Sequence, residues 1–282
     1  VCSRSEKRSR RFGGKFGCGR SFGDLDDMLK AHGGQLDFVY VGTPLASHYP
    51  IIEKCIDAGV NVLTEKPATR TATEWENLCR QAKTRGVLLI EGMWTNCLPT
   101  MQQAEAWIDE GRIGKVQWIR AELNKFNLPN IEKPQESKDL LMDYGVYALG
   151  FACRFLGGYP DAVKSEVRRN ANGEDADWSI AARRQDRIAV INLSSNSHAG
   201  SGAFVVGETG MIEWSSPFNR TNEIVLTSFQ SSTSVRMQYP YRHMGFEFQL
   251  EEVTRTLRTG LKESSILNHR MTSDTLRFSD QL

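Results

Sequence analysis

The chain has 282 residues, of which 40% are hydrophobic and 24% charged, as in a globular protein long enough for two domains. Its formal net charge of +1 argues against a global field that attracts nucleic acid or an anionic membrane. The six cysteines form no CxxC pair and lie near no histidine cluster. We therefore expect reduced thiols in the cytoplasm, with neither a disulfide frame nor a metal site.

The first 114 residues alternate between short apolar runs and segments with helical spacing. This rhythm predicts an α/β domain, residues 1–114, with a Rossmann-like doubly wound parallel sheet. The tail of a strand at Val1–Ser5 precedes a basic helix that begins at Glu6, with Ser5 as a possible cap, and that Gly13-Gly14 should break. The other expected strands are Leu36–Val41, Val60–Leu63 and Val87–Ile90, and the other expected helices are Asp24–Ala31, His48–Ala58, Thr73–Thr84 and Pro99–Glu110.

Beyond Gly114 the strand-like runs follow one another more directly, which is typical of an antiparallel sheet. We expect an α+β domain, residues 115–282, with an open antiparallel sheet. Its expected strands are Val116–Leu123, Ala162–Arg168, Trp178–Ala182, Arg187–Ser194, Ala203–Val206 and Ile224–Phe229, and its expected helices are Leu140–Leu156 and Phe246–Thr259. Asn127–Ser137, with two prolines, is the segment expected to be mobile. No apolar run approaches the length of a membrane span, and no signal peptide is recognisable.

The strand Val60–Leu63 runs directly into Glu65-Lys66-Pro67. Ligands of open α/β sheets bind at the carboxyl ends of the strands, so Lys66 is placed where chemistry takes place. Pro67 restricts the residue before it and should give the ammonium group a defined direction. Alternatively, the strand simply enters a surface loop that carries a solvated Glu-Lys pair.

Five blocks, in this order, resemble the Gfo/Idh/MocA family of glucose–fructose oxidoreductase and inositol dehydrogenase. The blocks are Val39-Tyr40-Val41-Gly42-Thr43-Pro44 with His48, Glu65-Lys66-Pro67, Glu91-Gly92-Met93-Trp94-Thr95, Asp143-Tyr144-Gly145-Val146-Tyr147 and Gly207-Glu208-Thr209-Gly210-Met211-Ile212-Glu213. Tyr147, where many relatives carry histidine, resembles the NADP-dependent dihydrodiol dehydrogenase and D-xylose dehydrogenase branch. The resemblance covers nearly the whole chain.

The resemblance also implies a dinucleotide site. It places Thr43, Pro44, His48, Glu65 and Lys66 in the cofactor groove, although His48 could equally be a solvent-facing residue at a helix start. Ser3 and Arg4 lie where relatives discriminate between cofactors, and a guanidinium with neighbouring hydroxyls suits the 2′-phosphate of NADP better than NAD. The alternative for this turn is a helix cap with a solvated arginine.

Family members open with a strand, a G-x-G-x-x-G turn and a helix, and the sequence does not contain this unit. Gly13-Gly14 and Gly17-Cys18-Gly19 do not replace it, because no buried strand precedes either. We expect a truncated gene model or a fragment, in preference to a chain that has lost its cofactor.

Oxidation of a secondary alcohol needs a hydride acceptor and a base for the hydroxyl proton. A phenol has an unperturbed pKa of about 10, and a nearby ammonium lowers it, so Lys66 and Tyr147 could form a catalytic pair. Asp143 lies four residues before Tyr147, on the same face of a helix, and could bind a substrate hydroxyl. Alternatively, Tyr147 packs against the sheet and Asp143 only lies near the helix start.

Trp94 and Asn96 are the remaining candidates for the substrate pocket. Trp94 is expected to wall the nicotinamide or substrate pocket, or else to be a core aromatic. Relatives often read W-x-R, and Asn96 takes the place of the arginine here. The segment before Asp143 is usually glycine-rich but reads Glu136-Ser137-Lys138-Asp139. Both departures affect the identity of the substrate.

Two classes of function follow from these features. The first is an NADP-dependent oxidoreductase that acts on a sugar or a cyclic diol, and Lys66 and Tyr147 favour it. The second is a truncated or non-catalytic relative that serves as a sensor, binding protein or scaffold, which the absent glycine-rich turn favours. In either case, strands such as Arg187–Ser194 carry apolar residues on both faces, which predicts a homodimer through the exposed face of the sheet.

Overall fold

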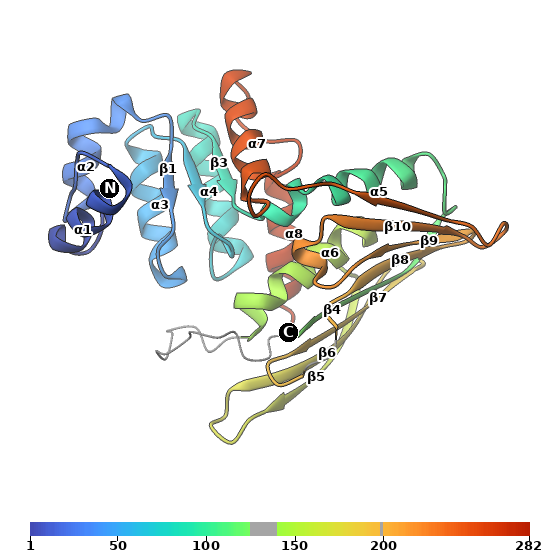
Figure 1. Cartoon of the computed structure of the whole chain (residues 1–282). Helices are drawn as coiled ribbons and strands as arrows, with labels where there is room; N and C mark the ends of the chain where they lie inside the picture. Colours follow the sequence, from blue (N-terminus) through green and yellow to red (C-terminus); the bar gives the residue numbers. More distant parts are fainter. Residues whose placement is uncertain (125–139, 198–199) are drawn as a thin grey trace.

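The computed structural model describes residues 1–124, 140–197 and 200–282, and within them the chain forms two β-sheets with packed helices (Figure 1). One sheet has three strands in the order β1-β2-β3, and the other has eight in the order β11-β10-β9-β8-β4-β7-β6-β5. None of the helices in these residues combines the length and the apolar character needed to cross a membrane. The segment Asn127–Ser137, predicted to be mobile, lies outside the described residues.

The three-stranded sheet is parallel, as predicted, and its strands are shorter than the sequence suggested. They are β1 (Val39–Val41), β2 (Val62–Thr64) and β3 (Leu89–Glu91). Successive side chains point to opposite faces, so Val62 joins the apolar core beneath α3 (His48–Asp57) and α4 (Ala72–Arg85). Leu63 joins the core beneath α7 (Phe246–Arg258). Helices therefore cover both faces, which is the Rossmann-like arrangement.

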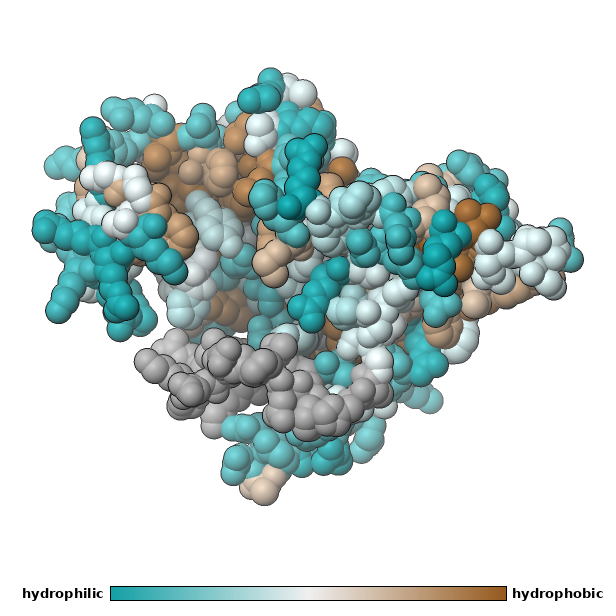
Figure 2. All heavy atoms as spheres, viewed as in Figure 1, coloured by the Kyte–Doolittle hydropathy of each residue, from teal (hydrophilic) through white to brown (hydrophobic). Residues whose placement is uncertain are grey.

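Two further helices, α1 (Glu6–Phe16) and α2 (Leu25–His32), precede this sheet. The prediction that Gly13-Gly14 breaks the first helix is wrong. Gly13 allows a close approach instead, because an added Cβ there would lie 3.0 Å from the Cys18 carbonyl oxygen. The helix ends at Gly17, whose φ of +70° favours glycine. Ser5 stands at the cap position but makes no capping hydrogen bond through its side chain. Figure 2 shows a largely hydrophilic surface in this part of the molecule.

The eight-stranded sheet contains every strand predicted for the second domain, together with two that the sequence did not reveal. The strands are β4 (Val116–Asn124), β5 (Ala162–Arg169), β6 (Asp175–Arg184), β7 (Arg187–Ser194), β8 (Ala203–Gly207), β9 (Gly210–Trp214), β10 (Glu223–Ser228) and β11 (Ser234–Gln238). The overlooked strands are β9 and β11. The edge strand β11 is short and largely exposed, and its polar–apolar alternation rests on only two apolar residues, Val235 and Met237.

One pair of strands departs from the predicted antiparallel pattern. The central strands β4 and β7 run parallel, with Ala121 opposite Ile191, whereas the other neighbours in this sheet are antiparallel. Parallel neighbours need a long connection. Here the chain between them forms α6 (Val146–Leu156), β5 and β6 before it returns.

Helix α6 packs across the inner face of β4 and β7 and carries the centre of the larger core. Its Phe151 ring lies 4.8 Å from the Phe155 ring, 5.0 Å from the Trp214 ring and 5.2 Å from the Phe218 ring, measured between centroids. Aromatic side chains bury large areas, so this cluster holds α6 firmly against the sheet.

Two helices complete the fold, α5 (Pro99–Asp109) and α8 (His269–Ser279). The sequence predicted the first but not the second. Helix α8 packs against α4, α6 and β3, so the end of the chain returns to the junction between the two sheets (Figure 1). Its buried face includes Thr272, Asp274 and Thr275 beside Leu276 and Phe278, and this polar content hides the apolar stripe of a packed helix.

Candidate active site

Lys66 follows the buried strand β2, as the sequence predicted, and reaches towards the second sheet. Its ammonium nitrogen lies 2.6 Å from the backbone carbonyl oxygen of Asp143 and 3.2 Å from the Asp143 carboxylate. The same nitrogen lies 5.1 Å from the centroid of the Tyr147 ring. The structure therefore brings together three predicted site residues from two distant segments. The Lys66–Pro67 peptide bond is cis.

The segment that carries Asp143 and Tyr147 is not a uniform α-helix. Leu141–Gly145 forms one π-helical turn, and α6 begins directly after it at Val146. Gly145 lies so close to β7 that an added Cβ would be 2.8 Å from Leu193 Cδ1. Single π-turns are frequent at functional sites because they change which backbone groups face the neighbouring segment. Here the Asp143 carbonyl oxygen accepts from Lys66.

Tyr147 is largely withdrawn from water, and its hydroxyl oxygen accepts a hydrogen bond of 3.3 Å from the Trp94 indole nitrogen. Burial raises the pKa of the Tyr147 phenol well above its ordinary value, and the carboxylates of Glu65 and Asp143 act in the same direction. The Trp94 hydrogen bond opposes this rise. The sequence predicted a lowered pKa for Tyr147, whereas the net shift is upward because burial dominates; the Lys66 ammonium lies over the ring face and engages Asp143.

Trp94 belongs to the larger apolar core, as the alternative interpretation predicted, and it also contacts Tyr147 and a residue that the sequence did not reveal. It begins a 3₁₀ turn, Trp94–Cys97, and its ring stacks on Phe246 with 4.6 Å between the centroids. Gly245 makes this stacking possible, since a Cβ there would lie 2.9 Å from Trp94 Cζ3. Because Phe246 comes from the start of α7, far along the chain, no local pattern could have indicated it.

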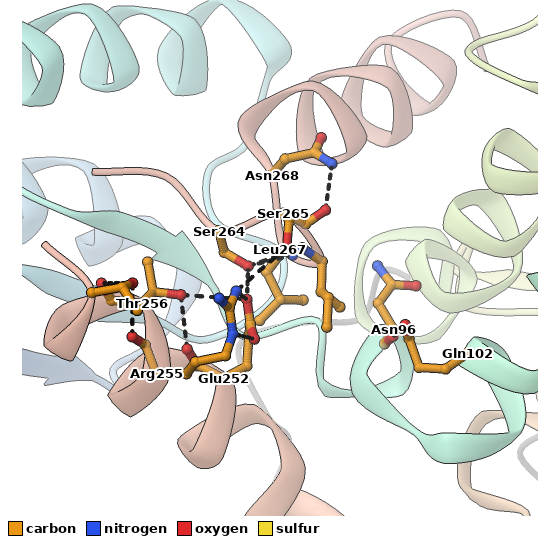
Figure 3. A network of polar contacts seen from close by, with 11 residues as sticks. Asn96, Gln102, Glu252, Arg255, Thr256, Ser264, Ser265, Leu267 and Asn268 are labelled. Atoms are coloured by element: carbon orange, nitrogen blue, oxygen red, sulfur yellow. Dashed lines mark hydrogen bonds and ion pairs between the residues drawn. The ribbon is translucent and has the colours of Figure 1, made fainter. Parts of the chain in front are cut away.

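Asn96 lies in the same 3₁₀ turn and is buried. Its backbone carbonyl oxygen accepts a 2.9 Å hydrogen bond from Gln102 Nε2 (Figure 3). No hydrogen bond between described residues joins Asn96 to Lys66, Asp143 or Tyr147. The structure thus places it beside Trp94 but does not connect it to the Lys66 cluster. The segment Glu136–Asp139, which the sequence singled out, lies outside the described residues.

The predicted groove residues around β1 form a connected group. His48 is buried, so the alternative that it faces solvent is wrong. Its Nε2 lies 2.8 Å from the Thr43 carbonyl oxygen and its Nδ1 lies 3.0 Å from the Pro67 carbonyl oxygen. His48 therefore ties the Thr43-Pro44 turn to the turn that carries Lys66. Nearby, the Tyr40 hydroxyl donates to the Glu65 carboxylate.

Ser3 and Arg4 lie apart from this group. A single parallel bridge between Cys2 and Phe22 holds their segment, outside the three-stranded sheet. Arg4 is exposed, and no ion pair among the described residues engages it; the adjacent carboxylate of Glu6 pairs with Arg10 at 2.7 Å. Its guanidinium is thus free to meet an anion, which fits the phosphate role expected for this turn.

Two models of one protein family match the chain. Residues 1–93 match the GFO/IDH/MocA model described as an oxidoreductase family with an NAD-binding Rossmann fold, and residues 101–213 match the GFO/IDH/MocA C-terminal domain. The chain belongs to the GFO/IDH/MocA family of oxidoreductases. It is similar to the trans-1,2-dihydrobenzene-1,2-diol dehydrogenases from Bos taurus (24% identity over 277 residues, 95% of this chain and 82% of the relative) and Homo sapiens (23% over 281 residues, 95% and 82%).

Two solved structures of enzymes share the fold. The aldose-aldose oxidoreductase from Caulobacter crescentus aligns with a TM-score of 0.85 at 19% identity, covering 99% of this chain and 86% of that one. The 3-ketoreductase KijD10 from Actinomadura kijaniata, in complex with NADP, aligns with a TM-score of 0.80 at 22% identity, covering 100% and 87%. At these identities the likeness shows the fold alone.

Proposed function

We propose that this protein is an NADP-dependent oxidoreductase that transfers hydride between nicotinamide and a hydroxyl or carbonyl carbon of a sugar or cyclic diol, with Lys66 and Tyr147 assisting. The observation that carries the proposal is the meeting of the Lys66 ammonium with Asp143 and the Tyr147 ring at the junction of the two sheets. The relatives named as dihydrodiol dehydrogenases and the aldose-aldose oxidoreductase support this class of substrate.

Tyr147 handles the proton of the reacting oxygen. Because its hydroxyl oxygen accepts from Trp94, its own proton is free to point at a substrate oxygen. Burial raises the pKa of the phenol, so Tyr147 is neutral near neutrality and acts as an acid when a carbonyl is reduced. In the oxidation direction the deprotonated Tyr147 oxygen receives the proton, so the rate rises with pH as the phenolate becomes populated.

Lys66 orients the substrate oxygen. An ammonium has three N–H donors, and two of them are directed at the Asp143 carbonyl oxygen and carboxylate. The third remains for the substrate, where a fixed positive charge stabilises the negative charge that develops on oxygen. Asp143 holds the ammonium and offers its carboxylate to a neighbouring substrate hydroxyl.

NADP suits the residues that would hold it. The exposed guanidinium of Arg4, with the hydroxyls of Ser3 and Ser5 beside it, would take the 2′-phosphate, and the Thr43-Pro44 turn with Glu65 would border the rest of the dinucleotide. When bound, the nicotinamide ring supplies the hydride acceptor or donor. The preference for NADP over NAD rests on Arg4 and on the lack of an acidic residue among residues 3–5.

Steady-state kinetics of the full-length protein test this proposal. We expect turnover of an aldose or a cyclic trans-diol with a kcat/KM for NADP⁺ roughly tenfold or more above that for NAD⁺, the scale of one charge-assisted hydrogen bond. Arg4→Ala should abolish the preference, whereas Arg10→Ala, which removes a neighbouring arginine paired with Glu6, should leave it unchanged. Equal or better efficiency with NAD⁺ would contradict the NADP assignment. Cofactor binding without turnover of any substrate would favour a sensor or scaffold.

We also propose a homodimer through the outer face of the eight-stranded sheet, opposite α6. Trp118 pairs with Ile188 on one neighbouring strand and with Val206 on the other, and both Trp118 and Ile188 are exposed. An apolar row in the middle of an uncovered sheet usually marks an interface. Light scattering at micromolar concentration should show a dimer that Trp118→Glu dissociates. Phe12→Glu, on the exposed surface of α1, should not, and a monomeric unsubstituted protein would refute the interface.

A cytoplasmic location fits the cysteines. All six are free thiols, and Cys55, Cys97 and Cys153 are buried. Free thiols of this kind are typical of a reducing compartment. Fractionation of cells followed by immunodetection tests the location, and recovery in a secreted or organellar fraction would contradict it.

A further inference from the structure

The turn that carries Lys66 is held by carboxylates. Alternate backbone N–H groups along residues 66–72 each donate to a carboxylate oxygen. The pairs are Lys66 N to Glu65 Oε2 (3.3 Å), Ala68 N to Glu91 Oε1 (2.9 Å), Arg70 N to Glu74 Oε2 (2.9 Å) and Ala72 N to Asp280 Oδ2 (3.0 Å). Hydrogen bonds to an ionised acceptor are shorter and stronger than neutral ones, so these contacts define the path of the turn.

Glu91 differs from the other three carboxylates because it is buried. It is 5% exposed at the end of β3, whereas Glu65 and Glu74 are partly exposed and Asp280 is exposed. Its Oε1 accepts from Ala68 N and its Oε2 accepts from the Thr272 hydroxyl of α8 at 2.9 Å. Burial raises the pKa of Glu91, while these two donors and the Lys66 charge favour its ionised form. A buried acceptor with both oxygens used is a rigid anchor.

We propose that Glu91 is a positioning residue for Lys66, which it serves by fixing the Lys66–Ala68 turn to β3 and, through Thr272, to α8. Glu91 acts through the backbone two residues beyond Lys66 and needs no contact with a substrate. The placement of Lys66 is a matter of structure alone, whereas its consequence for turnover rests on the proposed function.

Helix α8, which donates to Glu91 through Thr272, also packs against α6, the helix that carries Tyr147. Its Asp274 carbonyl oxygen accepts from the Cys153 thiol of α6, and Thr275 lies against Gly150 of the same helix. Helix α6 carries Tyr147 in its first turn. The hydrogen bond from Thr272 to Glu91 therefore links the Lys66 turn to the helix that packs against α6. We infer that α8 sets the spacing between Lys66 and Tyr147.

The test measures the reactivity of each lysine by reductive methylation and mass spectrometry in the full-length protein. Glu91→Leu removes the acceptor of the Ala68 N–H, and Lys66 should then be methylated roughly tenfold faster, the scale of one lost hydrogen bond to a charged group. Glu91→Gln keeps an oxygen acceptor and should restore the slow rate. Lys54, which pairs with Asp26 on the surface, should not change in either variant and reports global loosening.

A matched control removes a carboxylate of the same turn. Glu74→Leu frees the Arg70 N–H, four residues beyond Lys66, and should leave Lys66 methylation unchanged. An unchanged Lys66 rate in folded Glu91→Leu would overturn the proposal, as would an equal rise in Glu74→Leu. If Glu91→Leu does not fold, Thr272→Val decides: a faster Lys66 rate supports the proposal, and an unchanged rate overturns it.

Turnover provides a second readout. Glu91→Leu should lower kcat because Lys66 is no longer held in place, and Glu91→Gln, which keeps an oxygen acceptor for the Ala68 N–H, should recover most of the loss. If Lys66→Met retains full turnover, the proposed function fails, yet the methylation rates still report whether Glu91 positions Lys66. If the methylation rates do not respond while Lys66→Met is inactive, only the positioning role fails.

Discussion

The two halves of the candidate site are held in different ways. The Lys66 turn depends on directional polar contacts, in which its N–H groups donate to carboxylates and His48 contacts the Pro67 carbonyl oxygen. Tyr147 lies on a helix that is pressed on the sheet by a wide apolar core with Phe151 and Trp214 near its centre. Removal of a single hydrogen-bonding atom should therefore disturb the Lys66 turn, whereas removal of side-chain volume should disturb the packed helix that carries Tyr147.

The largest expected effect comes from removing one oxygen from the packed half. Tyr147→Phe keeps the ring beneath Lys66 and deletes the proton donor and acceptor. Turnover should fall about 10²–10⁴-fold, the usual range for a general acid or base, with affinity for NADP⁺ nearly unchanged. Single-turnover kinetics and cofactor titration measure the two quantities. Near-normal turnover would show that Tyr147 is only a packing residue.

Phe151→Ala tests whether apolar packing holds α6, the helix that carries Tyr147, against the sheet. The ring is 2% exposed and contacts three other aromatic side chains, so its loss should lower the free energy of unfolding by about 3–5 kcal/mol. Urea denaturation measures the change. The exposed Phe12 is the matched control, and Phe12→Ala should stay within about 0.5 kcal/mol of the unsubstituted protein. Similar losses for both would refute a core centred on α6.

Gly145→Ala tests the close approach at the π-turn. The added methyl group would lie 2.8 Å from Leu193 Cδ1 and 3.0 Å from Leu141 Cδ1, which should cost about 1–3 kcal/mol of stability. Turnover should also fall, because the turn presents Asp143 to Lys66. Gly14→Ala, where nothing lies within 4 Å of the added Cβ, should be neutral or slightly stabilising. An unaltered melting curve and turnover for Gly145→Ala would count against the steric account.

Tyr40→Phe should have the smallest effect. It deletes a hydroxyl that donates to Glu65 at the exposed rim of the polar half, and the expected loss is about 0.5–1.5 kcal/mol of unfolding free energy. Turnover should stay within a few-fold of normal, in contrast to Tyr147→Phe. A loss of turnover as large as that of Tyr147→Phe would mean that Tyr40 takes part in proton transfer.

Much of this site could be predicted from the sequence because its motifs stand at the ends of regular elements. Lys66 follows an apolar strand, and Asp143 and Tyr147 lie four residues apart, whereas their pairing with Lys66 was expected from the resemblance to the family and only if the two domains face each other. The parallel and the largely antiparallel sheet were predicted for the same reason, since alternation of strands and helices is legible in a sequence.

The features that the sequence did not predict depend on how deeply side chains are buried and on contacts between segments far apart in the chain. The pKa of Tyr147 was predicted in the wrong direction because burial, which dominates it, cannot be read from the residues around it. Phe246 reaches Trp94 from the other end of the chain. Helix α8 was not predicted because part of its buried face is polar. The hydrogen bond from Thr272 of this helix to Glu91 was therefore not predicted either.

The most direct test of the account is a double-mutant cycle on kcat/KM with Lys66→Met, Tyr147→Phe and the double variant. If the two side chains act as one unit, the double variant should be about as slow as the slower single variant, because residues that act together have strongly non-additive effects. If the two single losses instead multiply in the double variant, Lys66 and Tyr147 act independently, and the account of a joint site at the junction of the two sheets is contradicted.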